Sequence, residues 1–197
     1  SGRRILNQLA ELGVTRQELS GKRILEVGCG SGGILIPFTE IGAEVVGIDF
    51  DDTYMEAGRK RGLNLIDQSI YEFQAENKFD LIILKDVLEH LPDLNLVLQR
   101  LKSLLSETGI VYIQVPTFEG LEFLGYQNDF LRYFQNAHIV HFSEVSLNYI
   151  FAKNGFQVTA FDTSIESVDK VNSGIMPFVE DGAQDILRET LANGSFI

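Results

Sequence analysis

The 197-residue sequence is poor in several residue types, and each shortage excludes a class of protein. A single cysteine, Cys29, rules out an intrachain disulfide, and no plausible zinc site is expected. Lysine and arginine together number 16 against 28 acidic residues, which gives a net charge of −12 at pH 7. Because nucleic-acid phosphates require a basic surface, this balance argues against a nucleic-acid partner and favours a small-molecule substrate.

Long apolar runs are also missing. No run approaches the roughly 18 residues that a membrane-spanning helix needs, so no membrane span is expected. The start of the sequence is polar, so no signal peptide is expected. With 45% hydrophobic and 22% charged residues, the composition is that of an ordinary globular protein. We therefore expect a single cytoplasmic domain over residues 1–197.

The most informative stretch is residues 24–49, which read ILEVGCGSGGILIPFTEIGAEVVGID. An apolar run at 24–27 has the length of a buried parallel strand, and a turn with four glycines follows it. A helical pattern and a second strand ending in Asp49 come next. Glycines let a ligand touch the main chain, the helix start offers free N–H groups, and a terminal acid can bind the ribose hydroxyls. This order predicts a nucleotide-binding βαβ unit.

The four glycines fit two patterns. Gly28, Gly30 and Gly33 form G-x-G-x-x-G, the dinucleotide signature, and Asp49 follows Gly28 at about the 20-residue spacing of that fingerprint. Gly28, Gly30 and Gly32 form G-x-G-x-G instead. The first pattern predicts an NAD(P)-dependent oxidoreductase, which stays open here as the alternative.

Longer strings favour the second pattern. LEVGCGSG at 25–32, with Glu26 inside the strand, resembles the first motif of class I S-adenosylmethionine (SAM)-dependent methyltransferases. FDLI at 79–82, followed by VLEHLPD at 87–93, resembles the fourth-strand region of the same superfamily, and HIVHFS at 138–143 is typical of its small-molecule branch. The sequence is identified as similar to this superfamily over roughly residues 21–162.

The resemblance implies an α/β fold of the Rossmann-like, doubly wound kind, a mostly parallel sheet with helices on both faces. It also implies a SAM-dependent methyltransferase acting on a small molecule, with an oxygen of a sugar, quinone precursor or similar metabolite as the favoured acceptor. A non-catalytic SAM-binding module of a larger protein is the further alternative.

The same resemblance implies cofactor contacts. Glu26 and the glycine turn would hold the methionine end and Asp49 the ribose, while an apolar residue after Asp49 would lie against the adenine. Asp67 is an alternative polar contact. The predicted cofactor-binding residues are Glu26, Gly28, Cys29, Gly30, Gly32, Asp49, Phe50, Ser69, Ile70 and Lys85.

An oxygen acceptor must lose a proton, and a histidine suits that task near neutral pH. The sequence has three histidines, and His138 is the first candidate for the base, followed by His90. Packing or helix capping is the competing role for His90, and His141 is expected to be structural. Asp86 is a third catalytic candidate, placed to contact SAM or the acceptor. No metal is predicted, because Asp86 and Glu89 alone do not make a convincing ligand set.

The remaining patterns define elements. Residues 15–20 are expected to be a polar connection, 106–109 a turn, and the aromatic-rich stretch 117–142 a cap over the substrate pocket, with an extra helical layer as the alternative for its first part. Helices are predicted at 3–12, 52–61, 94–105, 144–153 and 180–192, and strands at 63–66, 79–84, 110–116, 156–161 and, weakly, 175–179.

Overall fold

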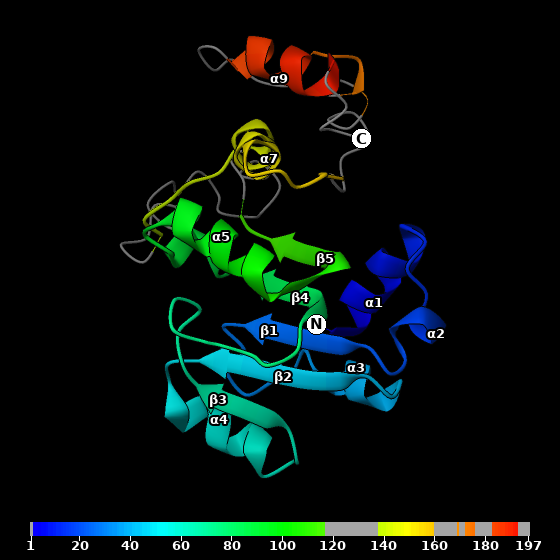
Figure 1. Cartoon of the computed structure of the whole chain (residues 1–197), viewed down its shortest axis with the longest axis vertical. Coiled ribbons are helices and arrows are strands. Elements are labelled where there is room, and N and C mark those ends of the chain that lie inside the picture. Colours follow the sequence, from blue (N-terminus) through cyan, green and yellow to red (C-terminus); the bar gives the residue numbers. More distant parts are fainter. Residues whose placement is uncertain (1, 117–137, 160–168, 170–171, 176–182, 193–197) are drawn as a thin grey trace, which may run out of the picture. The chain divides into compact units, whose positions relative to one another are not determined.

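The structure is a computed structural model that describes residues 2–116, 138–159, 169, 172–175 and 183–192 (Figure 1). Its contacts divide the chain into two compact units. The first unit comprises Ser1–Leu88 and Leu96–Gln114, and the second comprises Glu89–Asn95 and Val115–Ile197. Among the described residues, no helix combines the length and the apolar character needed to cross a membrane.

A five-stranded parallel sheet forms the first unit, in the order β3-β2-β1-β4-β5 (Figure 1). Its strands are β1 (Arg23–Val27), β2 (Glu44–Asp49), β3 (Asn64–Asp67), β4 (Phe79–Lys85) and β5 (Leu105–Gln114). The order reverses between β1 and β4, which is the switch point of a doubly wound fold and the usual place for a ligand. The predicted Rossmann-like sheet is confirmed.

Helices connect and cover these strands. They are α1 (Gly2–Glu11), α2 (Arg16–Leu19), α3 (Ile36–Glu40), α4 (Asp52–Arg59) and α5 (Leu94–Leu104), with the short 3-10 helix η1 (Leu88–His90) after β4. The described part of the second unit contains α7 (Glu144–Lys153) and α9 (Ala183–Ala192), which pack on each other. The predicted helices at 3–12, 52–61, 94–105 and 144–153 are confirmed, and α9 lies within the one predicted at 180–192.

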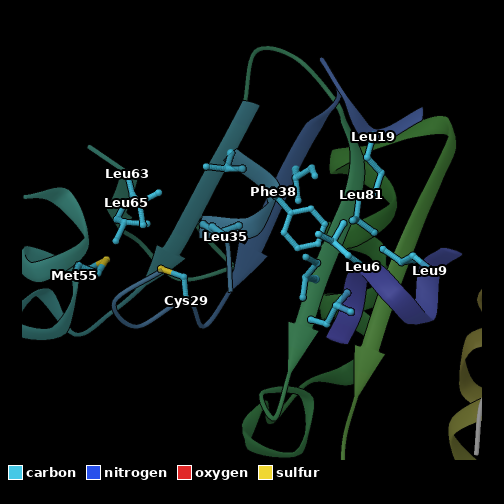
Figure 2. Packing of buried hydrophobic residues seen from close by; sticks show 14 residues of the cluster. Leu6, Leu9, Leu19, Cys29, Leu35, Phe38, Met55, Leu63, Leu65 and Leu81 are labelled. Carbon is cyan, nitrogen blue, oxygen red and sulfur yellow. The ribbon is translucent and has the colours of Figure 1, made fainter. Parts of the chain in front are cut away.

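One face of the sheet is covered by the N-terminal helices. Leu6 and Leu9 of α1 pack on the same side of the sheet as Leu81, with the Phe38 ring of α3 beside them (Figure 2). Side chains alternate along a strand, so the neighbours of Leu81 face the other way. The apolar side chains on that other face are buried too, as expected for a parallel sheet covered on both faces. The buried residues of that second set are Leu25, Val27, Ile82 and Leu84.

Helix α5 anchors the link between β3 and β4. Its buried residues, Val97, Leu98, Leu101 and Leu104, recur at helical spacing and form an apolar stripe. On the same helix, the Arg100 guanidinium donates hydrogen bonds to the backbone carbonyls of Ile70, at 3.3 Å, and Phe73. These bonds hold the segment that follows β3 and therefore position Ser69 and Ile70.

Two connections differ from the prediction. The polar stretch 15–20 contains helix α2, because Thr15 and Glu18 form a capping box. Its Thr15 hydroxyl accepts from the Glu18 N–H at 3.3 Å, and the Glu18 carboxylate accepts from the Thr15 N–H at 2.8 Å. The predicted turn at 106–109 belongs to β5, where the register with β4 jumps from Phe79↔Leu105 to Leu81↔Ile110. These four residues form an irregularity within the strand rather than a separate turn.

In the second unit, the predicted start of α7 is confirmed. Ser143 caps it, as its hydroxyl accepts from the Ser146 N–H at 3.1 Å, in a capping box that the Ser146 side chain completes. The predicted strand at 156–161 is reduced, over its described residues 156–159, to an isolated bridge at Val158. Residues 117–137 of the predicted cap and 176–179 of the weak predicted strand lie outside the described residues.

Candidate functional site

The glycine turn after β1 needs glycine at three of its positions. Gly28, Gly30 and Gly32 have φ of +70°, +50° and +71°, in the left-handed region that side chains rarely adopt. A Cβ on Gly28 would also lie 2.4 Å from the Val87 Cγ2 atom. Gly33 is not left-handed, and a Cβ there would meet nothing within 4 Å. The residues that must be glycine are thus those of G-x-G-x-G, the methyltransferase pattern.

Asp49 ties the end of β2 to this turn. Its Oδ2 accepts a hydrogen bond from the Gly30 N–H at 2.7 Å, and its Oδ1 accepts one from the Phe50 N–H at 2.7 Å. The Ile48 carbonyl next to it accepts from the N–H groups of Gly28, at 2.8 Å, and Cys29, at 3.1 Å. The turn is therefore shaped by the neighbouring strand, and each Asp49 oxygen retains a lone pair for a ligand hydroxyl.

Glu26 is a carboxylate buried inside β1. Its side chain is 3% exposed, and its Oε2 atom has no hydrogen-bond partner in the described part of the chain. Burial raises the pKa of Glu26 to about 8, and the negative charge of Asp49 adds to that rise while Lys85 opposes it. A buried oxygen without a partner is costly in a folded protein and marks a place where a ligand can bind.

The end of β4 holds a charged pair with an unusual backbone. The Lys85 ammonium donates a hydrogen bond to the Asp86 carboxylate. Asp86 has φ of +54° and is the one non-glycine residue with positive φ among the described residues. Its N–H donates to the Gln114 carbonyl at 2.8 Å, which fixes this conformation. Strained residues of this kind concentrate at functional sites.

A pocket of about 460 Å³ opens at the switch point between β1 and β4. It is lined by Glu26, Gly28, Cys29, Gly30, Gly33, Ile34 and Lys85. Five of these were predicted as cofactor contacts. Gly33 was assigned only to the dinucleotide pattern, and Ile34 was not predicted because the helix was expected to begin directly after the glycines. Helix α3 begins only at Ile36, so the pocket-lining turn is longer than the glycine pattern alone indicates.

Other predicted contacts lie beside this pocket or away from it. The space next to Gly32 is filled by Leu63, whose Cδ1 would be 2.6 Å from an added Cβ, so this glycine serves packing. Phe50 is 81% exposed, which leaves its ring available to a planar ligand. The Ser69 hydroxyl donates to Glu72 at 3.2 Å, and Ile70 is buried. Their predicted adenine contacts stay predictions.

The single cysteine has no catalytic chemistry here. The Cys29 thiol is buried, and burial raises its pKa to about 12, with the charges of Glu26 and Asp49 adding to the effect. A thiol with that pKa stays protonated near neutral pH and is a poor nucleophile. Its small size within the glycine turn explains the residue.

The catalytic candidates divide between the two units. Asp86 belongs to the first unit, whereas His90 and His138 belong to the second. Within the second unit the rings of His90 and His138 are neighbours, with centroids 4.9 Å apart, and the His141 ring lies 6.3 Å from that of His138. The structure thus brings together two histidines that are 48 positions apart in the sequence.

Comparison with known proteins gives a family. Residues 3–160 match the model of a methyltransferase domain family. The chain is also similar to ubiquinone biosynthesis O-methyltransferases, with 32% identity over 101 residues to the protein of Rhodopseudomonas palustris (strain TIE-1) and 34% over 101 residues to that of Bradyrhizobium sp. (strain ORS 278). Each match covers 48% of this chain and 40% of the relative's length.

Solved structures share the fold. Magnesium protoporphyrin IX methyltransferase from Synechocystis PCC 6803 with bound SAH is 21% identical, with a TM-score of 0.60 over 79% of this chain and 71% of that one. Its structure with bound SAM is 20% identical, with a TM-score of 0.57 over 79% and 67%. At this identity the likeness concerns the fold. With the family match over residues 3–160, it shows that the chain belongs to the methyltransferase domain family, within the class I SAM-dependent methyltransferase superfamily.

Proposed function

We propose that the chain binds SAM in the pocket at the ends of β1 and β4 and transfers the methyl group to an oxygen of a small molecule. The buried Glu26 carboxylate, which lines this pocket and has an Oε2 atom without a hydrogen-bond partner in the described residues, carries the proposal. A cationic ligand satisfies such a group by both hydrogen bonding and charge. SAM is a cation, with an ammonium and a sulfonium centre.

The same observation disfavours a dinucleotide. The pyrophosphate of NAD(P) would place negative charge close to Asp49 and would oppose the ionisation of Glu26, so it would gain nothing from this carboxyl group. The one lysine lining the pocket, Lys85, is paired with Asp86. Helix α3 is only 5 residues long, so it offers little of the dipole that stabilises a pyrophosphate in dinucleotide-binding folds.

The residues of the turn have distinct tasks in this proposal. Glu26 would hold the ammonium of the methionine end, and the glycine turn would let the ligand lie against the main chain. Asp49 would accept from the ribose hydroxyls, and Phe50, with Ser69 and Ile70, would contact the adenine. When bound, SAM supplies a methyl group already activated by its sulfonium, so the protein chiefly positions the acceptor and excludes water.

The acceptor is proposed from the relatives and the charge balance. The ubiquinone biosynthesis O-methyltransferases that match the chain make an oxygen of a quinone precursor or a similar metabolite the first choice. The chain spans 40% of the length of these relatives, so the acceptor is proposed as a class. Residues 117–142 are proposed as its cap, and His138, His90 or Asp86 as the group that removes its proton. With a net charge of −12, no nucleic-acid substrate is proposed, and a cytoplasmic location stays a prediction.

The direct test is turnover. The purified chain is incubated with SAM and a panel of phenolic, quinone-precursor and sugar acceptors, and formation of S-adenosylhomocysteine (SAH) and methylated product is followed by mass spectrometry. We expect methylated product from at least one hydroxyl-bearing acceptor. We expect this product to be lost in the Glu26→Gln variant. Cofactor binding without product on any acceptor would favour a non-catalytic SAM-binding module, and binding of NAD in place of SAM would favour an oxidoreductase.

A further inference from the structure

The second unit places three potential metal ligands together. Glu89 and His90 are consecutive residues of η1, and His138 comes from a distant part of the chain. One ligand atom from each residue lies within 4.8 Å of the other two. Ligand atoms bound to one ion lie about 3 to 4 Å apart at the usual metal–ligand lengths, so small rotations of these side chains close the site.

The main chain holds the two halves of this group together. The Glu89 carbonyl accepts hydrogen bonds from the N–H groups of Ile139, at 3.0 Å, and Val140, at 3.1 Å. His138 directly precedes these two donors, so its position next to Glu89 is set by backbone bonds. Its ring lies against that of His90 at an interplanar angle of 61°. The proximity of the three side chains therefore follows from the fold of this unit rather than from chance surface rotamers.

Burial and exposure fit an ion site that solvent can reach. The Glu89 side chain is 1% exposed, and a carboxylate at such depth is stabilised by positive charge close to it. His90, in contrast, is exposed, and His138 is partly exposed. An ion can thus enter from the side of His90 and bind a carboxylate that is held in place by its surroundings.

We propose that Glu89, His90 and His138 bind a divalent transition-metal ion, with Zn²⁺ or Mn²⁺ as representative ions. Two imidazoles and one carboxylate are a donor set that such ions accept, whereas Mg²⁺ and Ca²⁺ prefer oxygen donors alone. Three protein ligands leave at least one coordination position for water or another oxygen. This site was not predicted from the sequence, because only Asp86 and Glu89 were weighed as metal ligands, without His138.

Metal binding would change the roles of the two histidines. A ligating imidazole is neutral and has its lone pair on the ion, so it does not serve as a free base. A bound ion lowers the pKa of an oxygen that it coordinates, which offers another way to deprotonate an acceptor hydroxyl. That last step rests on the proposed methyl transfer, but binding of the ion does not.

The test is metal binding without SAM. The full chain, with its affinity tag removed and its metals stripped by a chelator, is titrated calorimetrically with Zn²⁺ and, separately, Mg²⁺, and Co²⁺ is added to follow its visible absorption bands. We expect one Zn²⁺ per chain, Co²⁺ bands that show nitrogen ligation, and much weaker binding of Mg²⁺. His90→Ala and His138→Ala should each weaken Zn²⁺ binding at least about tenfold, since each removes a direct ligand.

A neighbouring histidine gives the matched control. His141, whose ring lies 6.3 Å from that of His138, is outside the proposed ligand set, so His141→Ala should leave Zn²⁺ affinity unchanged. His90 is exposed, so His90→Ala should fold, and circular dichroism with SAH titration checks this. Absence of Zn²⁺ binding in the parent protein would overturn the metal site. Equal Zn²⁺ affinity in the parent, His90→Ala and His141→Ala proteins would overturn it as well. SAH binding is measured without metal, so failure of the methyltransferase proposal is detected separately.

Discussion

The Asp49 carboxylate connects the end of β2 to the glycine turn, because its Oδ2 accepts a hydrogen bond from the Gly30 N–H at 2.7 Å. The other oxygen accepts from the Phe50 N–H, also at 2.7 Å. Both acceptor atoms of one side chain thus shape the main chain around the pocket before any ligand is present. We infer that Asp49 has two functions, as the organiser of the turn and as the ribose acceptor.

Asp49→Asn should show that both functions depend on the two hydrogen bonds of this carboxylate and not only on its negative charge. The amide presents one oxygen and one NH₂ group to two N–H donors, so one hydrogen bond is replaced by a donor facing a donor. The free energy of unfolding should fall by about 1 to 3 kcal/mol in urea denaturation, and SAH affinity should fall at least about tenfold, or by 1.4 kcal/mol. Asp51→Asn is the control, because Asp51 caps α4 through the Thr53 N–H and asparagine caps as well. Equal behaviour of the two variants would contradict the assignment.

Glu26 should make the stability of the ligand-free protein fall as pH rises. Its pKa is about 8 in the folded protein, above its ordinary value of 4.5, so the folded state binds the proton more tightly than the unfolded state. The stabilisation is complete below pH 4.5 and is lost between pH 4.5 and about 8, with a slope of about 1.4 kcal/mol per pH unit at most. Urea denaturation of the parent and of Glu26→Gln across this range isolates the effect, since the amide does not titrate. An identical pH dependence of stability in both proteins would rule out Glu26 as its cause.

Binding of SAM should release a proton near pH 7. Glu26 is mainly protonated in the ligand-free protein below pH 8, whereas a cationic ligand stabilises the ionised form. Affinity should therefore rise with pH up to about 8 and then level off. Calorimetry at one pH in buffers of different ionisation enthalpy measures the released proton directly. Release that persists unchanged in Glu26→Gln would assign it to another group.

Gly28→Ala and Gly33→Ala should differ in their effect on stability. Gly28 has φ of +70°, and an added Cβ would lie 2.4 Å from Val87, so alanine there combines backbone strain with a clash. We expect a loss of about 1 to 3 kcal/mol in the free energy of unfolding. Gly33 has neither constraint, so its alanine variant should unfold within about 0.5 kcal/mol of the parent. Thermal or urea denaturation compares the pair, and a larger loss for Gly33→Ala would favour the dinucleotide pattern.

Most of the first unit could be predicted from the sequence because its signals are local. Buried β-branched runs, a glycine turn and a terminal acid identify β1, β2 and their connection, and the structure joins Glu26, Gly28, Cys29, Gly30 and Lys85 in one pocket. The length of the turn could not be predicted in the same way. Ile34 has the apolar spacing of a helix, but the helix begins only after Leu35, so Ile34 lines the pocket instead.

The features that were missed depend on contacts between distant residues. The strand β5 extends through Ser106–Gly109 because of its register with β4, which no local pattern records. The group formed by Glu89, His90 and His138 depends on hydrogen bonds from Ile139 and Val140 to Glu89, made across a long separation in sequence. Sequence patterns single out each histidine, but only the fold shows that two of them are neighbours.

The central claim, that this pocket is built for SAM, is tested most directly by calorimetric titration of the purified chain with SAH, with NAD alongside. We expect micromolar binding of SAH, no measurable binding of NAD, and loss of SAH affinity in Glu26→Gln, a variant that keeps the neutral shape of the protonated side chain and should remain folded. Binding of NAD without SAH, or SAH affinity that is unchanged in Glu26→Gln, would contradict the account.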